Sequence, residues 1–563
     1  MKTIQIKKYK IIPIGILLLW IISGCDNNFL DITPTDQISE VAMVSDSSLF
    51  EDYVINRYLG TRLQNKEGEG TSPGFGRGFE YGMWSTITDE SMYTNDDDTW
   101  LIQRGQLSPG NLGIAGVTWG RSYRSIRECN YALSIINDVE MSNTYREILR
   151  AEIKFIRAYR YFDLIRNYGG IVLLGDKVYN LDDDYSDETI YERSNIKDCI
   201  DYVVSELDEA SKKLPVEYTS SWEKGRGTSG ASLALKARLL LYAASPLYLN
   251  GESDVAKWNK AAEAAKDVMD LHIYSLYSNY GSLFLSEDNK ESIFSRYYVT
   301  GARHICLEIS YGPNGYGGWG GATPFQNLVD AYEMNNGKTI DDPTSGYNPQ
   351  DPYVNRDSRF YASILYDGSE YRGRKVETFI PGGFDSKDGA SNWNTSKTGY
   401  YQRKWMDDNN PIDNPWNVAG LQPWPYMRYA EVLLNYAEAQ NEAGGPDQSV
   451  YDAVNEVRGR AEMPDLPSGL SQSEMRDRIR KERQVELAFE EHRFYDVRRW
   501  MIADEVENEP GYGMKITKNG DSFTYEKFIA LTGRSFETKH YWLPIPRDEI
   551  LATDNMLEQN EGY

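Results

Sequence analysis

Apolar residues recur at three- and four-residue steps in several parts of the chain, a spacing typical of amphipathic helices. We expect helices in five segments: 151–168, 231–244, 258–271, 428–443 and 450–461. Helix-ending residues follow four of them: Gly169-Gly170, Pro246, Gly444-Gly445 and Pro464. Small residues at close-packing positions in paired helices indicate tetratricopeptide-like units, although no strict 34-residue repeat is visible. An irregular all-helical domain is the alternative.

Two long segments between the helices have a different composition. Residues 66–120 and 300–425 are rich in Gly, Asn, Asp, Pro and aromatic residues. Loops of this length are usually functional or disordered, and their aromatic content argues against disorder. We therefore predict a mainly α fold: a tetratricopeptide-like scaffold that includes 151–170, 231–271, 428–463 and 474–500, with ordered loop-rich excursions and a few short strands.

The N-terminus has the layout of a signal peptide. Lys2, Lys7, Lys8 and Lys10 precede an apolar stretch over 11–22, which is shorter than the about 20 residues that a membrane-spanning helix needs. The following Ile-Ser-Gly-Cys ends at Cys25 and resembles the lipobox of bacterial lipoproteins. We expect a signal peptide over 1–24 and a tether over 25–37, lipidated at Cys25 and held at a membrane by several acyl chains. An ordinary signal peptide is the alternative.

The formal net charge of the chain is −25. Removing residues 1–24 takes away four lysines and no acids, which leaves −25 − 4 = −29. Because an acidic protein repels phosphate backbones, nucleic acid is not expected as a partner. Cys129, Cys199 and Cys306 form no disulfide framework, and the four histidines form no ligand-spaced pair, so no cofactor or metal is expected.

The acidic runs 96–98 and 182–184 lack the spacing of a calcium loop, and we interpret them as solvated surfaces.

The densest charge cluster lies over 482–500. On one continuous helix Glu482, Glu486 and Glu490 would share a face and repel each other unless cations intervene. Arg483 and Arg493 are placed to supply those cations, which favours a ladder of ion pairs over a catalytic site. No nucleophile elbow, zinc-protease motif or phosphate-binding loop is present. No enzyme is expected, although carboxylate pairs are too numerous to exclude a surface glycoside hydrolase.

Sugar binding needs aromatic rings for the C–H face of a pyranose and polar groups for its hydroxyls. Two loop regions offer this mixture. The candidate ligand-binding residues are Tyr81, Trp84, Asp89, Trp100, Tyr316 and Trp319. Loops carry function disproportionately, but a role in core packing is the alternative for each tryptophan.

Several segments resemble the hallmark blocks of the SusD/RagB family. They are 29–31, 328–332, 356–359, RYAEVLLNYAEA at 428–439, VNEVRGRA at 454–461, ERQVELAFEEHRFYDVRRW at 482–500, and 543–546 with 559–563. They run from the tether to the last residue in the family's order. One departure is Glu491, where the family commonly has Gly; within a continuous helix no Gly would be needed.

The resemblance implies one large helical domain over 38–563, lipid-anchored at the outer membrane and facing the cell exterior. It also implies a non-enzymatic function: capture of glycans, and delivery to a SusC-like TonB-dependent transporter. Oligopeptide capture for the same kind of transporter is the alternative that the resemblance leaves open. No site residue follows from it, because the glycan contacts of the family vary and lie outside these blocks.

Overall fold

The structure is a computed structural model that describes residues 40–59, 75, 79, 83–96, 98–180, 182–301, 303–411 and 420–563. Cys25 and Tyr81 lie outside the described residues. The longer helices are α2 Ser47–Asn56, α4 Thr118–Ile135, α5 Asn143–Tyr168, α6 Ile196–Ser211, α7 Ser229–Ala244, α8 Val255–Met269, α13 Tyr429–Gly444, α14 Gln448–Arg460, α15 Gln472–Glu486 and α16 His492–Arg499. The shorter ones are α1 Glu40–Ser45, α3 Trp100–Gln103, α9 Tyr280–Leu283, α10 Leu307–Ser310, α11 Gln326–Ala331, α12 Ser358–Ser363, α17 Ala503–Val506 and α18 Arg547–Ala552.

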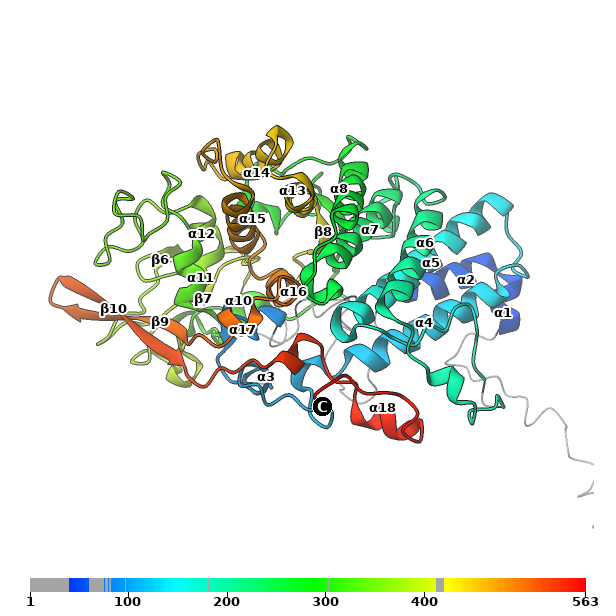
Figure 1. Cartoon of the computed structure of the whole chain (residues 1–563). Helices are drawn as coiled ribbons and strands as arrows, with labels where there is room; N and C mark the ends of the chain where they lie inside the picture. Colours follow the sequence, from blue (N-terminus) through cyan, green and yellow to red (C-terminus); the bar gives the residue numbers. More distant parts are fainter. Residues whose placement is uncertain are drawn as a thin grey trace, which may run out of the picture.

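Each long helix of the scaffold packs on the next one. Contacts join α4 to α5, α5 to α6, α6 to α7, α7 to α8, α8 to α13, and α13 to both α14 and α15. This serial packing is how tetratricopeptide-like units build a continuous core, and it confirms the predicted fold class. Figure 1 shows α4–α8 on the right, with α13–α15 above the centre.

Residues 270–428 leave the scaffold between α8 and α13, although these two helices pack directly on each other. This excursion contains α9–α12 and most of the strands, as the composition of 300–425 predicted. The strands are β1 Ser91–Tyr93, β2 Ser292–Arg296, β3 Ala322–Pro324, β4 Ile364–Leu365, β5 Glu370–Tyr371, β6 Arg374–Lys375, β7 Tyr401–Gln402, β8 Trp424–Arg428, β9 Gly511–Asn519 and β10 Ser522–Leu531. Among the described residues they form five antiparallel pairs: β1–β3, β2–β8, β4–β7, β5–β6 and the long β9–β10 hairpin at the left of Figure 1.

Local sequence explains where the helices begin and end. Ser142 caps the N-terminus of α5, which therefore starts before the predicted 151, and Gly169 at φ 78° ends it. Ser471 and Glu474 form a reciprocal capping box at the start of α15. The predicted helices over 231–244, 258–271, 428–443 and 450–461 are confirmed as α7, α8, α13 and α14 to within three residues.

The segment 482–500 is not one helix. The helix α15 ends at Glu486, and α16 begins only at His492. Between them Phe489 and Glu491 have φ values of 66° and 67°, a left-handed conformation that favours glycine. The expectation that Glu491 occupies an ordinary helical position is therefore wrong. The glycine that the family commonly has at this position adopts such a conformation without strain. The glutamate of this chain adopts it at some cost in strain.

Glu482, Glu486 and Glu490 do form ion pairs, but the predicted pairing with Arg483 and Arg493 is wrong. Glu486 accepts hydrogen bonds from Arg428 at 2.6 Å, from Arg359 at 3.0 Å and from Arg460, and Glu490 accepts from Arg428 and Lys404. Arg359, Lys404 and Arg428 come from the excursion and its return strand, so the network joins the excursion to α15. Burial acts to raise the pKa of Glu486, but Arg460, Arg428 and Arg359 outweigh it and hold that pKa well below its ordinary value.

The two arginines predicted to pair with these glutamates bind other carboxylates. Arg483 pairs with Asp496, and Arg493 binds Asp89. The carboxylates of Glu482, Glu486 and Glu490 are thus neutralised structural groups.

Candidate ligand-binding site

A short strand pair brings the two loop regions predicted to bind ligand together. β1 pairs with β3, with Tyr93 opposite Ala322, and the Thr94 amide donates to the Gly321 carbonyl at 2.8 Å. The segments around 84–100 and 311–319 are therefore neighbours, although more than 200 residues separate them in sequence. Their individual side chains nevertheless have different environments.

Trp84 and Asp89 lie in the interior. Trp84 is 1% exposed and packs against Phe494, with ring centroids 4.5 Å apart. Asp89 is 5% exposed, and Arg493 donates to both of its carboxylate oxygens at 2.8 and 2.7 Å. The prediction that these two residues contact ligand does not fit their burial. The core-packing alternative describes Trp84, and the ion pair accounts for Asp89.

Trp100, Tyr316 and Trp319 are half-buried. The indole nitrogen of Trp100 donates to the Tyr93 carbonyl at 2.8 Å, which fixes the ring beside β1. The hydroxyl of Tyr316 reaches the backbone carbonyls of Tyr371 and Arg374 at 2.8 and 3.1 Å. Trp319 is held through its backbone, where its amide donates to the Ile309 carbonyl at 2.6 Å.

Two strongly exposed aromatic side chains lie beside this region. Phe384 is 61% exposed and Trp393 is 66% exposed. The guanidinium carbon of Arg374 lies 3.7 Å from the centre of the Tyr316 ring and 5.7 Å from that of Phe384, so the cation links the two rings. We call Tyr316, Arg374, Phe384 and Trp393 the aromatic platform.

The loop that carries Phe384 and Trp393 is held in place by buried polar contacts. Arg374 donates to both oxygens of Asp385 at 2.7 and 2.9 Å, and the side chain of Asp385 is fully buried. Asn314 donates to the carbonyls of Ser386 and Ala390 at 3.1 and 2.9 Å. A bidentate pair of this kind fixes both position and orientation. The exposure of the two rings is therefore a property of an ordered loop.

Glycines allow the neighbouring segment to approach this loop closely. A Cβ added at Gly315 would lie 2.4 Å from an Asp385 carboxylate oxygen and 2.6 Å from the Phe384 carbonyl. A Cβ at Gly320 would lie 2.5 Å from the Asn394 carbonyl, directly after Trp393. Any larger residue would separate the two segments. The glycine-rich stretch 312–321 thus has a steric role in building the platform.

The sequence prediction included Tyr316 but not Phe384, Trp393 or Arg374. The signal for them was present: Gly382-Gly383-Phe384 and Asn392-Trp393-Asn394 show the same mixture of glycine, amide and aromatic residues that led to 311–319. Composition does not distinguish Trp393 from the buried Trp84, because it contains no information on which side of the backbone meets solvent.

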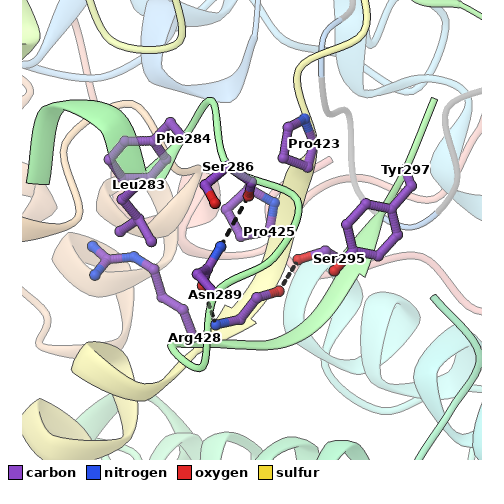
Figure 2. A pocket seen from close by; sticks show the side chains of 10 residues that line it. Leu283, Phe284, Ser286, Asn289, Ser295, Tyr297, Pro423, Pro425 and Arg428 are labelled. Carbon is purple, nitrogen blue, oxygen red and sulfur yellow. Dashed lines mark hydrogen bonds between the residues drawn. The ribbon is translucent and has the colours of Figure 1, made fainter. Parts of the chain in front are cut away.

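One cavity beside the ion-pair network is too small for a sugar ring. The cavity in Figure 2 lies between Phe284, Tyr297, Pro423 and Arg428, and its volume is about 10 Å³. Asn289 bridges its wall by donating to the Ser286 carbonyl at 2.9 Å and accepting from the Ser292 amide at 2.8 Å. This volume is close to the least that holds one water molecule. An open surface such as the platform suits a glycan better.

In the part of the chain that the structure describes, no three His, Cys, Asp or Glu side chains come together as a metal site would require. The three described cysteines are buried free thiols.

The fold and the platform define a mainly helical, tetratricopeptide-like protein whose loops present an exposed aromatic surface. A model of the SusD family matches residues 284–563, and a model described as starch-binding associating with outer membrane matches 29–241. The chain belongs to the SusD family, which confirms the resemblance found in the sequence.

Three similar proteins illustrate this relationship. A SusD-like protein from Bacteroides fragilis is 30% identical with a TM-score of 0.76, and the match covers 94% of this chain and 100% of that one. A SusD-like carbohydrate binding protein from the same organism is 25% identical with a TM-score of 0.74, over 91% of this chain and 99% of that one. A SusD-like protein of Formosa agariphila is 25% identical over 86% of this chain and 91% of its own length.

Proposed function

We propose that this protein captures glycans on its aromatic platform and delivers them to a TonB-dependent transporter at the outer membrane. The observation that carries the proposal is the exposure of Phe384 and Trp393 on a loop fixed by Arg374 and Asp385. Large exposed aromatic side chains on an ordered surface mark interaction sites. Rings already held in place also avoid part of the entropy cost of binding.

The chemistry of the platform suits a sugar. The face of a pyranose ring carries C–H bonds that pack on Phe384 and Trp393. Ser391 and Asn392 are exposed beside Trp393 and offer hydrogen-bonding groups for ring hydroxyls. We retain Tyr316 and Trp319 as partly buried ligand contacts at the edge of the platform. Trp100 is retained as a more distant contact.

The comparisons support the ligand class. One relative of known structure is described as a carbohydrate binding protein, and one matching family model is described as starch-binding and associated with the outer membrane. Among the described residues, no helix combines the length and the apolar character needed to cross a membrane. In the proposal, lipid on Cys25 holds the chain at the outer membrane with its platform facing outward, beside a SusC-like partner.

We further propose that the protein is not an enzyme. The carboxylates of the densest acidic cluster, Glu482, Glu486 and Glu490, are buried in ion pairs with arginine or lysine. A glycosidase acid needs a raised pKa beside its substrate, whereas the pKa values of Glu486 and Glu490 are lowered, because cations outweigh the effect of burial.

Isothermal titration of the protein lacking residues 1–24 against glycan and peptide panels tests the proposal. Binding to at least one glycan, with no product release during incubation, is expected. Binding to peptides with no binding to any glycan would replace the ligand class by oligopeptides. Release of shorter sugars by the purified protein would establish a hydrolase instead.

A further inference from the structure

The charges that surround the platform differ from those of the chain as a whole. The chain carries a formal charge of −25. Residues 370–397 contain five basic residues (Arg372, Arg374, Lys375, Lys387 and Lys397) and four acidic ones (Glu370, Glu377, Asp385 and Asp388). The segment that presents the exposed rings therefore has a net charge of +1, counting 5 − 4.

The acids of the platform loop face inward or bind its backbone. Asp385 is fully buried against Arg374 and also accepts from the Glu377 amide at 2.8 Å. Glu377 accepts from the Phe384 amide at 3.3 Å, and Asp388 accepts from the Gly382 amide at 3.2 Å. These three carboxylates are thus used to shape the loop.

The lysines of the same loop have no such partners. Lys387 follows Phe384 by three residues, Lys397 follows Trp393 by four, and both are exposed. Neither lysine takes part in an ion pair with any residue that the structure describes. Each exposed ring of the platform is therefore followed by an exposed, unpaired ammonium group.

The described residues include two more strongly exposed aromatic side chains, Tyr185 and Trp222. Tyr185 directly follows the acidic run 182–184, and no lysine lies within the next four residues. Trp222 is followed by Glu223 and Lys224, but this lysine is half-buried and paired with Asp288 at 2.6 Å. Among the described residues, a strongly exposed ring followed by an exposed, unpaired lysine is thus specific to the platform.

We propose that the platform binds anionic glycans, meaning chains whose sugars carry carboxylate or sulfate groups. Phe384 and Trp393 pack on the sugar faces, and Lys387 and Lys397 contact the anionic substituents. The proposal rests on the proposed function and adds the substrate class of the same site. Lysine acts here as a point charge, so it recognises the charge of the substituent more than its geometry. Binding through exposed charges also weakens as salt screens them.

The experiment compares three probes by isothermal titration at 50 and 500 mM NaCl: polygalacturonate oligomers, sulfated carrageenan oligomers and neutral β-1,3-glucan oligomers. Binding to at least one anionic probe is expected, with an affinity that falls at high salt. The double variant Lys387→Gln/Lys397→Gln should bind that probe roughly tenfold more weakly, the range expected for two exposed ionic contacts. Lys212→Gln/Lys260→Gln is the control, because these lysines are exposed at the end of α6 and on α8.

Binding only to the neutral glucan would overturn the anionic class and leave glycan capture standing. Unchanged affinity for an anionic probe in the Lys387/Lys397 variant would also overturn it. No binding to any glycan in a wider panel would instead refute the proposed function. All four substituted lysines are exposed, so circular dichroism is expected to show both variants folded like the parent.

Discussion

The guanidinium group of Arg374 binds the buried carboxylate of Asp385 through two hydrogen bonds and lies 3.7 Å from the centre of the Tyr316 ring. One side chain thus connects the glycine-rich stretch 312–321 to the loop that exposes Phe384 and Trp393. This contact makes Arg374 a positioning residue for the platform.

Arg374→Ala should loosen the platform loop without unfolding the protein. Because the substitution leaves the buried Asp385 carboxylate without its cation, the loss in unfolding free energy should be about 1–3 kcal/mol. Amide exchange at 383–389 should become faster, and glycan affinity should fall. Arg374→Lys keeps the charge but not the bidentate geometry. It should therefore restore little of the slow amide exchange and little of the glycan affinity. Exchange rates and affinity equal to those of the parent in both variants would refute the positioning role.

Arg428→Met should be strongly destabilising. It leaves Glu291, Glu486 and Glu490 without a shared buried partner, and breaking a buried ion pair costs about 3–5 kcal/mol. Urea denaturation measures the change. Arg476→Met is the matched control, because its pair with Glu442 is partly exposed and should contribute less than about 1 kcal/mol. Similar losses in both variants would show that the network does not join the excursion to the scaffold.

Glycine should be preferred over alanine at position 491. The residue has φ 67°, where a Cβ costs about 1–2 kcal/mol and glycine is nearly free of strain. Both substitutions remove the same carboxylate, so their difference isolates the backbone effect. Glu491→Gly should be more stable than Glu491→Ala by about 1 kcal/mol in urea denaturation. Equal stability would mean that the backbone changes conformation in solution.

Loss of the Glu90 proton should lower the free energy of unfolding as pH rises from 6.5 to 8. Burial, and then the charge of Asp89, raise its pKa to about 8 from an ordinary 4.5, against the opposing effect of Arg493. The folded state therefore binds the Glu90 proton more tightly than the unfolded state does. The contribution of this proton to the free energy of unfolding is complete below pH 4.5 and lost as pH rises through 8. The slope can reach about 1.4 kcal/mol per pH unit.

Glu90→Gln should flatten that slope. Asp367, with a pKa raised by burial to about 6, and Lys404, with a pKa lowered by burial to about 8, also titrate near this window. Both are present in the variant and the parent, so the difference between the two slopes isolates Glu90. The pKa values of His304 and His540, lowered by burial to about 3 and 4, lie below the window. Denaturation midpoints measured at pH 6.5, 7.2 and 8.0 provide the slopes. A slope that is the same in the variant and the parent would refute the role of Glu90.

The sequence predicted the scaffold well, because helical periodicity and helix-ending residues are local signals. Small residues such as Ala237 and Ala265 pack the helices closely, and Gly169 ends α5 where a left-handed residue is needed. The break before α16 was not predictable in this way. Its left-handed positions are filled by Phe489 and Glu491, neither of which marks a turn.

The site was predicted only in part, because composition identifies the loops but not the direction of each side chain. Trp84 and Trp393 both lie in regions rich in glycine, polar and aromatic residues, yet one packs on Phe494 and the other faces solvent. The same limit applies to the ion pairs. Arg359 and Lys404 reach α15 from positions more than 80 residues away, and no local pattern reveals that contact.

The central claim is that the platform binds glycan, and a titration that compares three variants tests it most directly. Phe384→Ala and Trp393→Ala each remove one exposed ring of the platform, whereas Trp222→Ala removes an equally exposed ring elsewhere. We expect the first two to weaken glycan binding at least fivefold, corresponding to about 1 kcal/mol for a lost aromatic contact, and the third to leave it unchanged. Unchanged affinity in both platform variants, or an equal loss in Trp222→Ala, would contradict the account.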